Sequence, residues 1–295
     1  MTTSRLEWNA DTDPAQRAAR VIALGALDDA MDAEERVARR APETVHRFRV
    51  ALRQLRSWLR VYRRCLDDTL SGRTRRRLRR IARATTDLRD LDVQLEWLRA
   101  ERRALGDSRL AAAKWIRSTL KADRKRAWRR FRRVRADKFA GTTSALQHEL
   151  THYIVERDIH RTDEDDRMRP VSAQLLREQA DALETAFGRV RSADDTKRLH
   201  RARIIAKQTR YHLELLGDYA AEAPAVTDEL RRFQDIVGDL RDAQLLAHRV
   251  SREVTKIAAQ RTALVASELV YRPTGPMDFL RVVTNSPFDT SLALL

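Results

Sequence analysis

Basic side chains between residues 46 and 60 are spaced so that they could together hold a strongly negative ligand. The stretch VHRFRVALRQLR (45–56) and the arginine at 60 place basic residues every three or four positions. At 100° per residue, these positions fall within an arc of about 80° on one helix. They are His46, Arg49, Arg53, Arg56 and Arg60, here called the first stripe. Because a guanidinium fork donates paired hydrogen bonds to phosphate oxygens, the first stripe predicts phosphate binding.

The simpler interpretation of a charged helix face is that it is solvated. A solvated face normally mixes acidic and basic residues, whereas stacked cations repel one another by a few tenths of a kcal/mol per pair, on the order of 0.2 to 0.5. An apolar stripe of normal width lies beside the cations and predicts which side of the helix is buried. It consists of Val45, Phe48, Leu52, Leu55, Leu59 and Tyr62. Arg47 points away from both stripes, so it marks the solvated side.

The same arrangement occurs a second time in the chain. LHRARIIAKQTR (199–210) aligns with VHRFRVALRQLR, and the second stripe is formed by His200, Arg203, Lys207 and Arg210. The one departure is Glu214, which stands where the first stripe has Arg60. Downstream, DLRDLD (87–92) aligns with DLRDAQ (239–244). Two motifs repeated in the same order predict duplicated helical bundles related by pseudo-symmetry.

The elements that would carry these stripes are all helices. Glycine is rare, apolar residues recur every three or four positions, and alternating β-branched runs are absent, which predicts an all-α fold. Helices are expected at 14–40, 43–67, 72–104, 108–138, 143–157, 172–191, 194–217, 222–248 and 251–270. The predicted domains are a first bundle at 14–157, a linker at 158–171, a second bundle at 172–270 and an irregular tail at 271–295.

The composition favours an anionic partner in the cytoplasm. Lys and Arg total 59 against 43 Asp and Glu, which gives a net charge of +16, and 52 of the basic residues are arginine. Cys65 has no second cysteine with which to form a disulfide, and the first residues lack the apolar segment of a secretory signal. No apolar run reaches the length that spans a bilayer. We therefore expect no membrane association, and the oligomeric state stays open.

With these motifs in view, the sequence resembles the CHAD domain family of histidine-bearing α-helical domains. The resemblance rests on V-H-x-x-R-V-x-x-R-x-x-R (45–56), R-D-L-D (89–92), L-H-x-x-R-I-x-x-K-x-x-R-Y (199–211) and F-Q-D-I-V-G-D-L-R-D (233–242). It implies a pair of four-helix bundles around a basic central groove or pore that binds inorganic polyphosphate. The triphosphate-processing barrel often fused to such domains has no counterpart in this sequence.

The resemblance also implies which residues face the phosphates. These are His46, Arg49, Arg53, Arg56, His200, Arg203, Lys207 and Arg210, with Arg60, Arg80 and Arg83 as an outer set. In the repeat, Arg232 matches Arg80, but Asp235 replaces Arg83, so the outer set is incomplete in the second half.

Metal chemistry is the alternative that the sequence raises and disfavours. HELTH (148–152) is an H-E-x-x-H motif, in which two histidines bind zinc and Glu149 would act as general base. No credible third ligand follows, because the positions available, Asp158 and His160, lie in a linker-like stretch. His46 and His200 lack a second ligand on their own helix faces, and the acids of the DLRD motifs are expected to pair with guanidinium groups. We therefore expect no metal site, no cofactor and no catalysis.

Two classes of function remain on the sequence alone. The first is a non-catalytic polyphosphate-binding module that localises to polyphosphate granules. The second is a nucleic-acid-binding protein, because a charge of +16 produces non-specific affinity and tryptophans lie among the arginines of 114–130. No helix-turn-helix, RNA-binding aromatic motif or basic zipper is evident to read bases.

Overall fold

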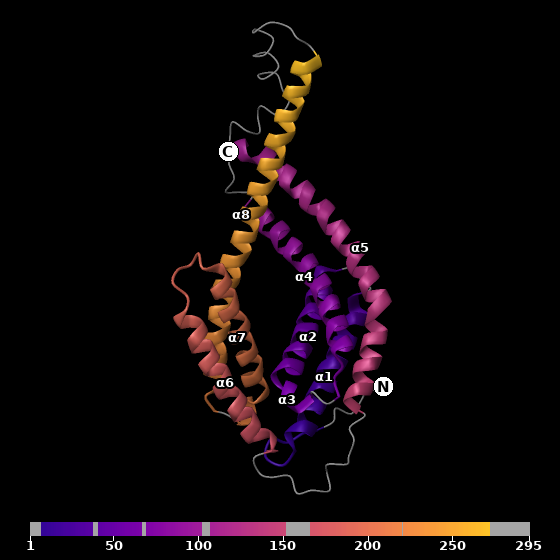
Figure 1. Ribbon diagram of the computed structural model, residues 1–295, viewed down its shortest axis with the longest axis vertical. Coiled ribbons are helices and arrows are strands. Elements are labelled where there is room, and N and C mark those ends of the chain that lie inside the picture. Colours follow the sequence, from indigo (N-terminus) through magenta and orange to yellow (C-terminus); the bar gives the residue numbers. More distant parts are fainter. Residues whose placement is uncertain are drawn as a thin grey trace. The chain divides into compact units, whose positions relative to one another are not determined.

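The computed structural model describes residues 7–37, 41–66, 69–101, 107–151, 166–219 and 221–271, and it is helical throughout (Figure 1). Its helices are α1 (Ala15–Arg36), α2 (Pro42–Val61), α3 (Arg63–Leu66), α4 (Gly72–Ala100), α5 (Asp107–Thr151), α6 (Met168–Gly188), α7 (Thr196–Leu215), the 3-10 turn η5 (Gly217–Tyr219) and α8 (Ala223–Tyr271). No strand occurs in these residues, which confirms the predicted all-α class. Nor does any helix within them combine the length and apolar character needed to cross a membrane.

Two predicted helix breaks were wrong. Helix α5 passes without interruption through Gly141, and α8 passes through 249–250. A glycine inside a helix costs only about 1 kcal/mol relative to alanine, and burial of Phe139 and Leu146 on either side offsets that cost.

The predicted linker at 158–171 and tail at 271–295 lie largely outside the described residues. Helix α6 nevertheless begins at Met168, inside the predicted linker. Pro170 is compatible with this start, because the missing N–H of a first-turn proline has no partner within the helix anyway. The tail begins at Tyr271, the last residue of α8, and its other residues are outside the described part of the chain.

By its internal contacts the chain divides into two compact units. Unit 1 is formed by residues 1–89 and 127–239, and unit 2 by residues 90–126 and 240–295. Both stripes belong to unit 1, and the long helices α4, α5 and α8 supply residues to each unit. The units do not follow the two halves of the sequence repeat, so the assignment of duplicated bundles stays a prediction.

The apolar face of α2 forms the centre of unit 1. Every residue of the predicted apolar stripe is buried: Val45, Phe48, Leu52, Leu55, Leu59 and Tyr62. Phe48 packs on two aromatic rings of α5, with ring centroids 6.2 Å from Phe131 and 5.3 Å from Phe139. Helix α1 lies along α2, and α6 lies along α7 (Figure 1). This packing fixes which side of α2 is left for the basic stripe.

A buried polar cluster joins the end of α2 to α6 and α7. The hydroxyl of Tyr62 lies 2.8 Å from Nε2 of His212 and 3.2 Å from Oγ of Ser172, and all three side chains are buried. Burial lowers the pKa of His212 to about 4, so the ring is neutral at pH 7. Burial of a neutral histidine has little electrostatic cost, so α7 can pack against the end of α2 at this point.

Unit 2 has its own small core. Leu98, Ile116 and Leu120 are buried together, and Trp115 and Val250 pack against them. Ion pairs of Arg124 with Asp92 and of Arg249 with Asp123 brace the helices within this unit. Asp92 therefore pairs with and orients a guanidinium group, as the sequence predicted for the acids of the DLRD motifs.

Substitution of Tyr62 by Phe should destabilise the protein by about 1 to 3 kcal/mol, because it leaves buried groups of His212 and Ser172 without their hydrogen-bond partner. The free energy of unfolding is measured by urea denaturation. The control is Tyr219→Phe, whose hydroxyl accepts only a long bond of 3.4 Å from the backbone N–H of Ala10. Equal, small losses in the two variants would show that the buried cluster does not hold the helices together.

Candidate functional site

Apart from Arg60, the members of the two basic stripes are half-buried, so the stripes are not fully solvated faces. His46, Arg49, Arg53 and Arg56 of α2 are all of intermediate exposure, whereas Arg47 is exposed. The second stripe on α7 repeats this pattern, since His200, Arg203, Lys207 and Arg210 are also of intermediate exposure. A half-buried arginine keeps its charge but loses much of its hydration, so it interacts more strongly with an anion than an exposed one does.

Helices α2 and α7 bring the two stripes together at Tyr211. Nε of Arg53 on α2 donates a hydrogen bond of 2.9 Å to the hydroxyl of Tyr211 on α7. The guanidinium carbons of Arg53 and Arg210 lie 5.8 and 4.5 Å from the centroid of the same ring. One aromatic ring thus holds a cation from each stripe through cation–π contacts.

Lys207 stands among cations from both helices. Its pKa is lowered to about 7 by burial first, and then by the charges of Arg53, Arg203, Arg49 and Arg210 in that order. Two of these arginines belong to α2 and two to α7, so the amine sits where the stripes converge. At pH 7 Lys207 is therefore only partly charged, because its amine is buried and because four arginines surround it.

Helix α4 adds cations that the sequence analysis did not select. Burial lowers the pKa of His46, and the charges of Arg49, Arg89 and Arg53 lower it further. Burial likewise lowers the pKa of Arg56, followed by the effects of Arg60 and Arg79. Arg79 and Arg89 therefore lie close to the first stripe. The repeat held a signal for Arg89, which is the arginine of DLRDLD, but nothing in the spacing distinguished Arg79 from its many basic neighbours.

The N-terminal part of α8 positions the arginines of the second stripe. Nε of Arg203 donates to the backbone carbonyl of Gln234 (3.1 Å), and Nε of Arg210 donates to Oε1 of the same residue (3.4 Å). Gly238 leaves room for Arg203, because a Cβ atom there would stand 2.9 Å from its Nη2. The motif F-Q-D-I-V-G-D thus serves to hold two arginines, a role that its sequence alone did not reveal.

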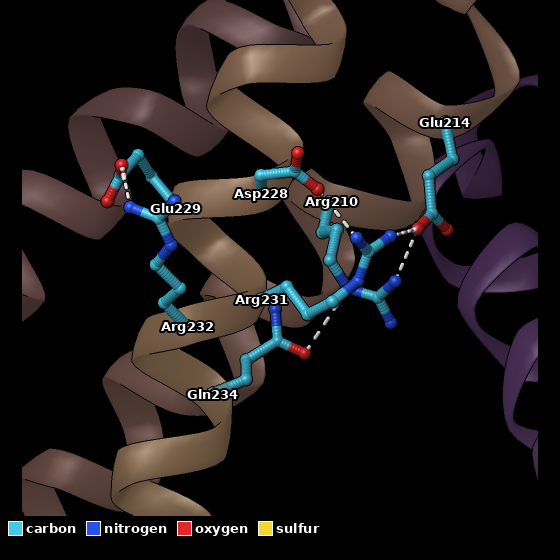
Figure 2. Close-up of polar contacts among 7 residues, drawn as sticks. All are labelled: Arg210, Glu214, Asp228, Glu229, Arg231, Arg232 and Gln234. Atoms are coloured by element: carbon cyan, nitrogen blue, oxygen red, sulfur yellow. Dashed lines mark hydrogen bonds and ion pairs between the residues drawn. The ribbon is translucent and has the colours of Figure 1, made fainter.

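Glu214 changes the second stripe at the position where the first has Arg60. Figure 2 shows its carboxylate between Arg210 and Arg231, with ion pairs to both and a distance of 3.4 Å to Arg231. Arg231 also pairs with Asp228 at 2.6 Å. The second stripe therefore ends in a partly neutralised network. Arg53 and Arg56 of the first stripe, by contrast, form no ion pair with an acidic side chain of the described chain.

The outer residues of the predicted set occupy different places. Arg232 pairs with Glu229 on its own helix at 2.8 Å, and both side chains are 72% exposed (Figure 2). Arg60 and Arg83 are exposed as well. Arg80 lines a pocket between α4 and α5 to which α2 contributes no residue. Within this outer set, Arg60 lies close to the rest of the first stripe, since its charge helps to lower the pKa of Arg56.

The HELTH motif has a structural role at Glu149. Its carboxylate accepts hydrogen bonds from the backbone N–H of Ser71 (3.1 Å) and from the hydroxyl of Thr74 (2.8 Å), so it caps the start of α4. His152 lies outside the described residues. Within the described part of the chain, no three His, Cys, Asp or Glu side chains come together as a metal site requires.

The tryptophans among the arginines serve mainly in packing. Trp58 is only 4% exposed and stacks on Tyr62, with ring centroids 6.3 Å apart. Trp128 packs against Phe131 at 5.6 Å, and Trp115 contacts the core of unit 2. Trp97 differs, being 44% exposed. Three of these four rings are thus engaged within the fold.

Comparison with known proteins identifies relatives of this architecture. The family model of the CHAD domain matches residues 22–251, well over half of the chain. The crystal structure of the CHAD domain from the plant Ricinus communis superposes with a TM-score of 0.64 and 19% identity, over 96% of both chains. PptA from Streptomyces chartreusis superposes with a TM-score of 0.61 and 16% identity, over 80% of this chain and 85% of that chain. At such identities the likeness shows the fold alone, and no curated protein matches the sequence.

The lowered pKa of Lys207 predicts a specific pH dependence of stability. An unfolded lysine titrates near 10.5, so between pH 7 and that value the unfolded state binds more protons than the folded state. The free energy of unfolding should therefore rise with pH in this window, and Lys207→Met should remove about 1 to 2 kcal/mol of the rise between pH 7 and 9. Urea denaturation at the two pH values measures it.

The matched control is Lys197→Met, at an exposed position of the same helix, which should keep the pH dependence of the unsubstituted protein. An unchanged slope in Lys207→Met would contradict the convergence of the stripes on this amine.

Proposed function

The chain belongs to the CHAD domain family, and from this premise we propose that it binds inorganic polyphosphate on the paired stripes of α2 and α7. The observation that carries the proposal is the meeting of cations from α2 and α7 at the ring of Tyr211 and around Lys207. Arg49 and Arg53 approach it from α2, and Arg203 and Arg210 from α7. A linear polyanion supplies closely spaced negative charges along its length, which is the pattern that two adjacent basic stripes complement.

The excess of arginine favours phosphate over other anions. Each guanidinium offers a planar fork of donors that fits two phosphate oxygens. Bound phosphates would relieve the repulsion within each stripe, where basic residues follow one another at helical spacing. Relief of this repulsion contributes to binding without any change in the fold, since the side chains are already held in place.

The primary ligands in this proposal are the half-buried members of both stripes, together with two neighbours from α4. They are Arg49, Arg53, Arg56, Arg203, Lys207 and Arg210, supplemented by Arg79 and Arg89. His46 is disfavoured as a cation in the free protein, because burial and neighbouring arginines lower its pKa. We propose that His46 contacts phosphate as a neutral ring, through an N–H that donates a hydrogen bond.

We propose a binding role without catalysis. Permanently charged arginines can clamp phosphate, but they provide no positioned base to activate water. The one carboxylate that the sequence offered as a general base, Glu149, accepts two hydrogen bonds at the start of α4. That engagement supports a structural role for the HELTH helix.

We also propose that the two halves of the repeat are pseudo-symmetric bundles that each supply one stripe, because the motifs at 45–56 and 199–210 align. A second proposal, that the protein acts on polyphosphate granules, follows from the proposed polyphosphate binding. A protein that only holds long chains gains avidity wherever those chains are dense, since several phosphates engage it at once.

Arg53→Ala should weaken polyphosphate binding by about 1 to 3 kcal/mol, as expected for loss of a charge-assisted hydrogen bond. Arg47→Ala removes the same charge from the exposed side of α2 and should have little effect. Lys207→Ala should weaken binding as Arg53→Ala does. Isothermal titration with long-chain polyphosphate at fixed salt measures the affinities, after circular dichroism has shown that each variant folds. Indistinguishable losses in the three variants would leave only bulk charge as the cause of binding.

Competition with duplex DNA at matched phosphate concentration separates the two classes of ligand. We expect polyphosphate to displace DNA, because no element of the described chain is arranged to read bases. DNA would therefore bind only through non-specific attraction between its phosphates and the basic side chains. Displacement of polyphosphate by DNA would favour the nucleic-acid alternative.

Binding should also draw protons from solution. With a pKa of about 7, Lys207 is mostly neutral at pH 8, and adjacent phosphates favour its charged form. Titrations at pH 8 in buffers of different ionisation enthalpy should reveal uptake of about one proton per bound site. Lys207→Arg carries its charge permanently, so it should bind with much less uptake. Equal uptake in the two proteins would assign the proton to another group.

A further inference from the structure

A separate basic pocket lies between α4 and α5. It has a volume of about 240 Å³ and is lined by Arg73, Arg76, Arg77 and Arg80 of α4 and by Lys138 of α5. The four arginines follow one another at spacings of three, one and three residues, so they share one flank of α4. Gly72 leaves space for the guanidinium of Arg76, since a Cβ atom there would stand 3.3 Å from its Nη1.

The cations of this pocket have no neutralising partners within the described chain. None of the five side chains forms an ion pair or a hydrogen bond with another described residue. Nearby on α5, two arginines are paired with acids: Arg130 with Asp87 of α4 at 2.9 Å, and Arg135 with Glu34 of α1 at 3.2 Å. The fold therefore neutralises two guanidinium groups of α5 within eight residues of Lys138 and leaves the pocket positive, at a cost in repulsion.

The pocket is distinct from the two stripes. Arg79 is the residue of this part of α4 whose charge acts on the first stripe, through Arg56. On a helical wheel the four lining arginines centre about 110° from Arg79, with Arg77 about 160° and Arg76 about 60° away, so the pocket and the first stripe lie on different flanks of α4. The pocket lining includes no residue of α2 or α7.

We propose that this pocket is a second anion site, which takes an inorganic oligophosphate of two or three phosphates. Guanidinium forks suit phosphate oxygens, and several cations around a compact space match a small ligand of high charge. The lining contains only arginine and lysine, with no aromatic or apolar side chain to receive a base. A nucleoside triphosphate would therefore bind through the same phosphates, with no gain from its nucleoside. This site does not depend on polyphosphate binding at the stripes.

The test is isothermal titration of the full chain with inorganic triphosphate. To weaken binding at the stripes, the titrations use a background that carries Arg53→Ala and Lys207→Met, here called the silenced background. Adding Arg77→Gln and Lys138→Gln should weaken triphosphate binding at least about tenfold, on the order of 1.4 kcal/mol or more. Adding Arg47→Gln and Arg132→Gln removes the same two charges from exposed positions outside the pocket, and should change affinity less than about twofold.

Equal losses from the pocket pair and the control pair would overturn the proposal, as would an absence of triphosphate binding in the silenced background. Circular dichroism and urea denaturation confirm that the variants fold. A second arm replaces triphosphate with ATP, which should bind within about threefold of triphosphate, or under 1 kcal/mol. ATP binding at least about tenfold tighter would overturn the assignment to inorganic oligophosphate. Failure of the stripe proposal would appear in long-chain polyphosphate titrations, so the two outcomes are distinguishable.

Discussion

Helices α2 and α7 carry like charges toward one another, and neutral contacts in the interior hold them together. Tyr62 joins α2 to His212 of α7 and to Ser172 of α6 by buried hydrogen bonds, and His212 is neutral because burial lowers its pKa. Nearer the surface, Arg53 donates to Tyr211. These contacts work against the repulsion between the stripes, which costs a few tenths of a kcal/mol, about 0.2 to 0.5, for each adjacent pair of cations. The geometry of the site therefore depends on a cluster that bears no charge.

Because of this arrangement, repulsion between the stripes destabilises the folded protein even when no ligand is bound. Lys207 shows the cost directly, since its surroundings lower its pKa to about 7. The arginines cannot respond by losing a proton, so they are held by other means: Arg203 by the carbonyl of Gln234 and Arg210 by Glu214. A ligand that meets side chains already ordered loses less entropy on binding than one that must order them. In the proposed site, release of this electrostatic strain is what would favour binding of an anion.

The sequence predicted the fold class and the two faces of α2 because helical periodicity alone separates buried from basic positions. Its predicted breaks at 139–142 and 249–250 were wrong, since glycine and charged residues interrupt a helix only when packing does not compensate. It could not identify Arg79, Gln234 or Gly238, whose roles arise from neighbouring helices. For the same reason, spacing could not assign Arg80 to a pocket with Lys138, a residue far away in the sequence. Periodicity describes the faces of one helix at a time, whereas each candidate site is formed by side chains from two or more helices.

The difference between Arg60 and Glu214 makes the two stripes unequal in a way that their aligned motifs conceal. In the second stripe, Glu214 and Gln234 hold Arg210, and the backbone of Gln234 holds Arg203, so these side chains have little freedom. In the first stripe, Arg53 is held by a neutral hydroxyl, and neither Arg53 nor Arg56 has an acidic partner in the described chain. A carboxylate partner competes with an incoming phosphate, whereas a tyrosine hydroxyl does so only weakly. The first stripe therefore presents the stronger field to an anion, and the second presents the more rigid surface. Two aligned motifs thus place their basic side chains in different surroundings, one beside a neutral hydroxyl and the other beside a carboxylate.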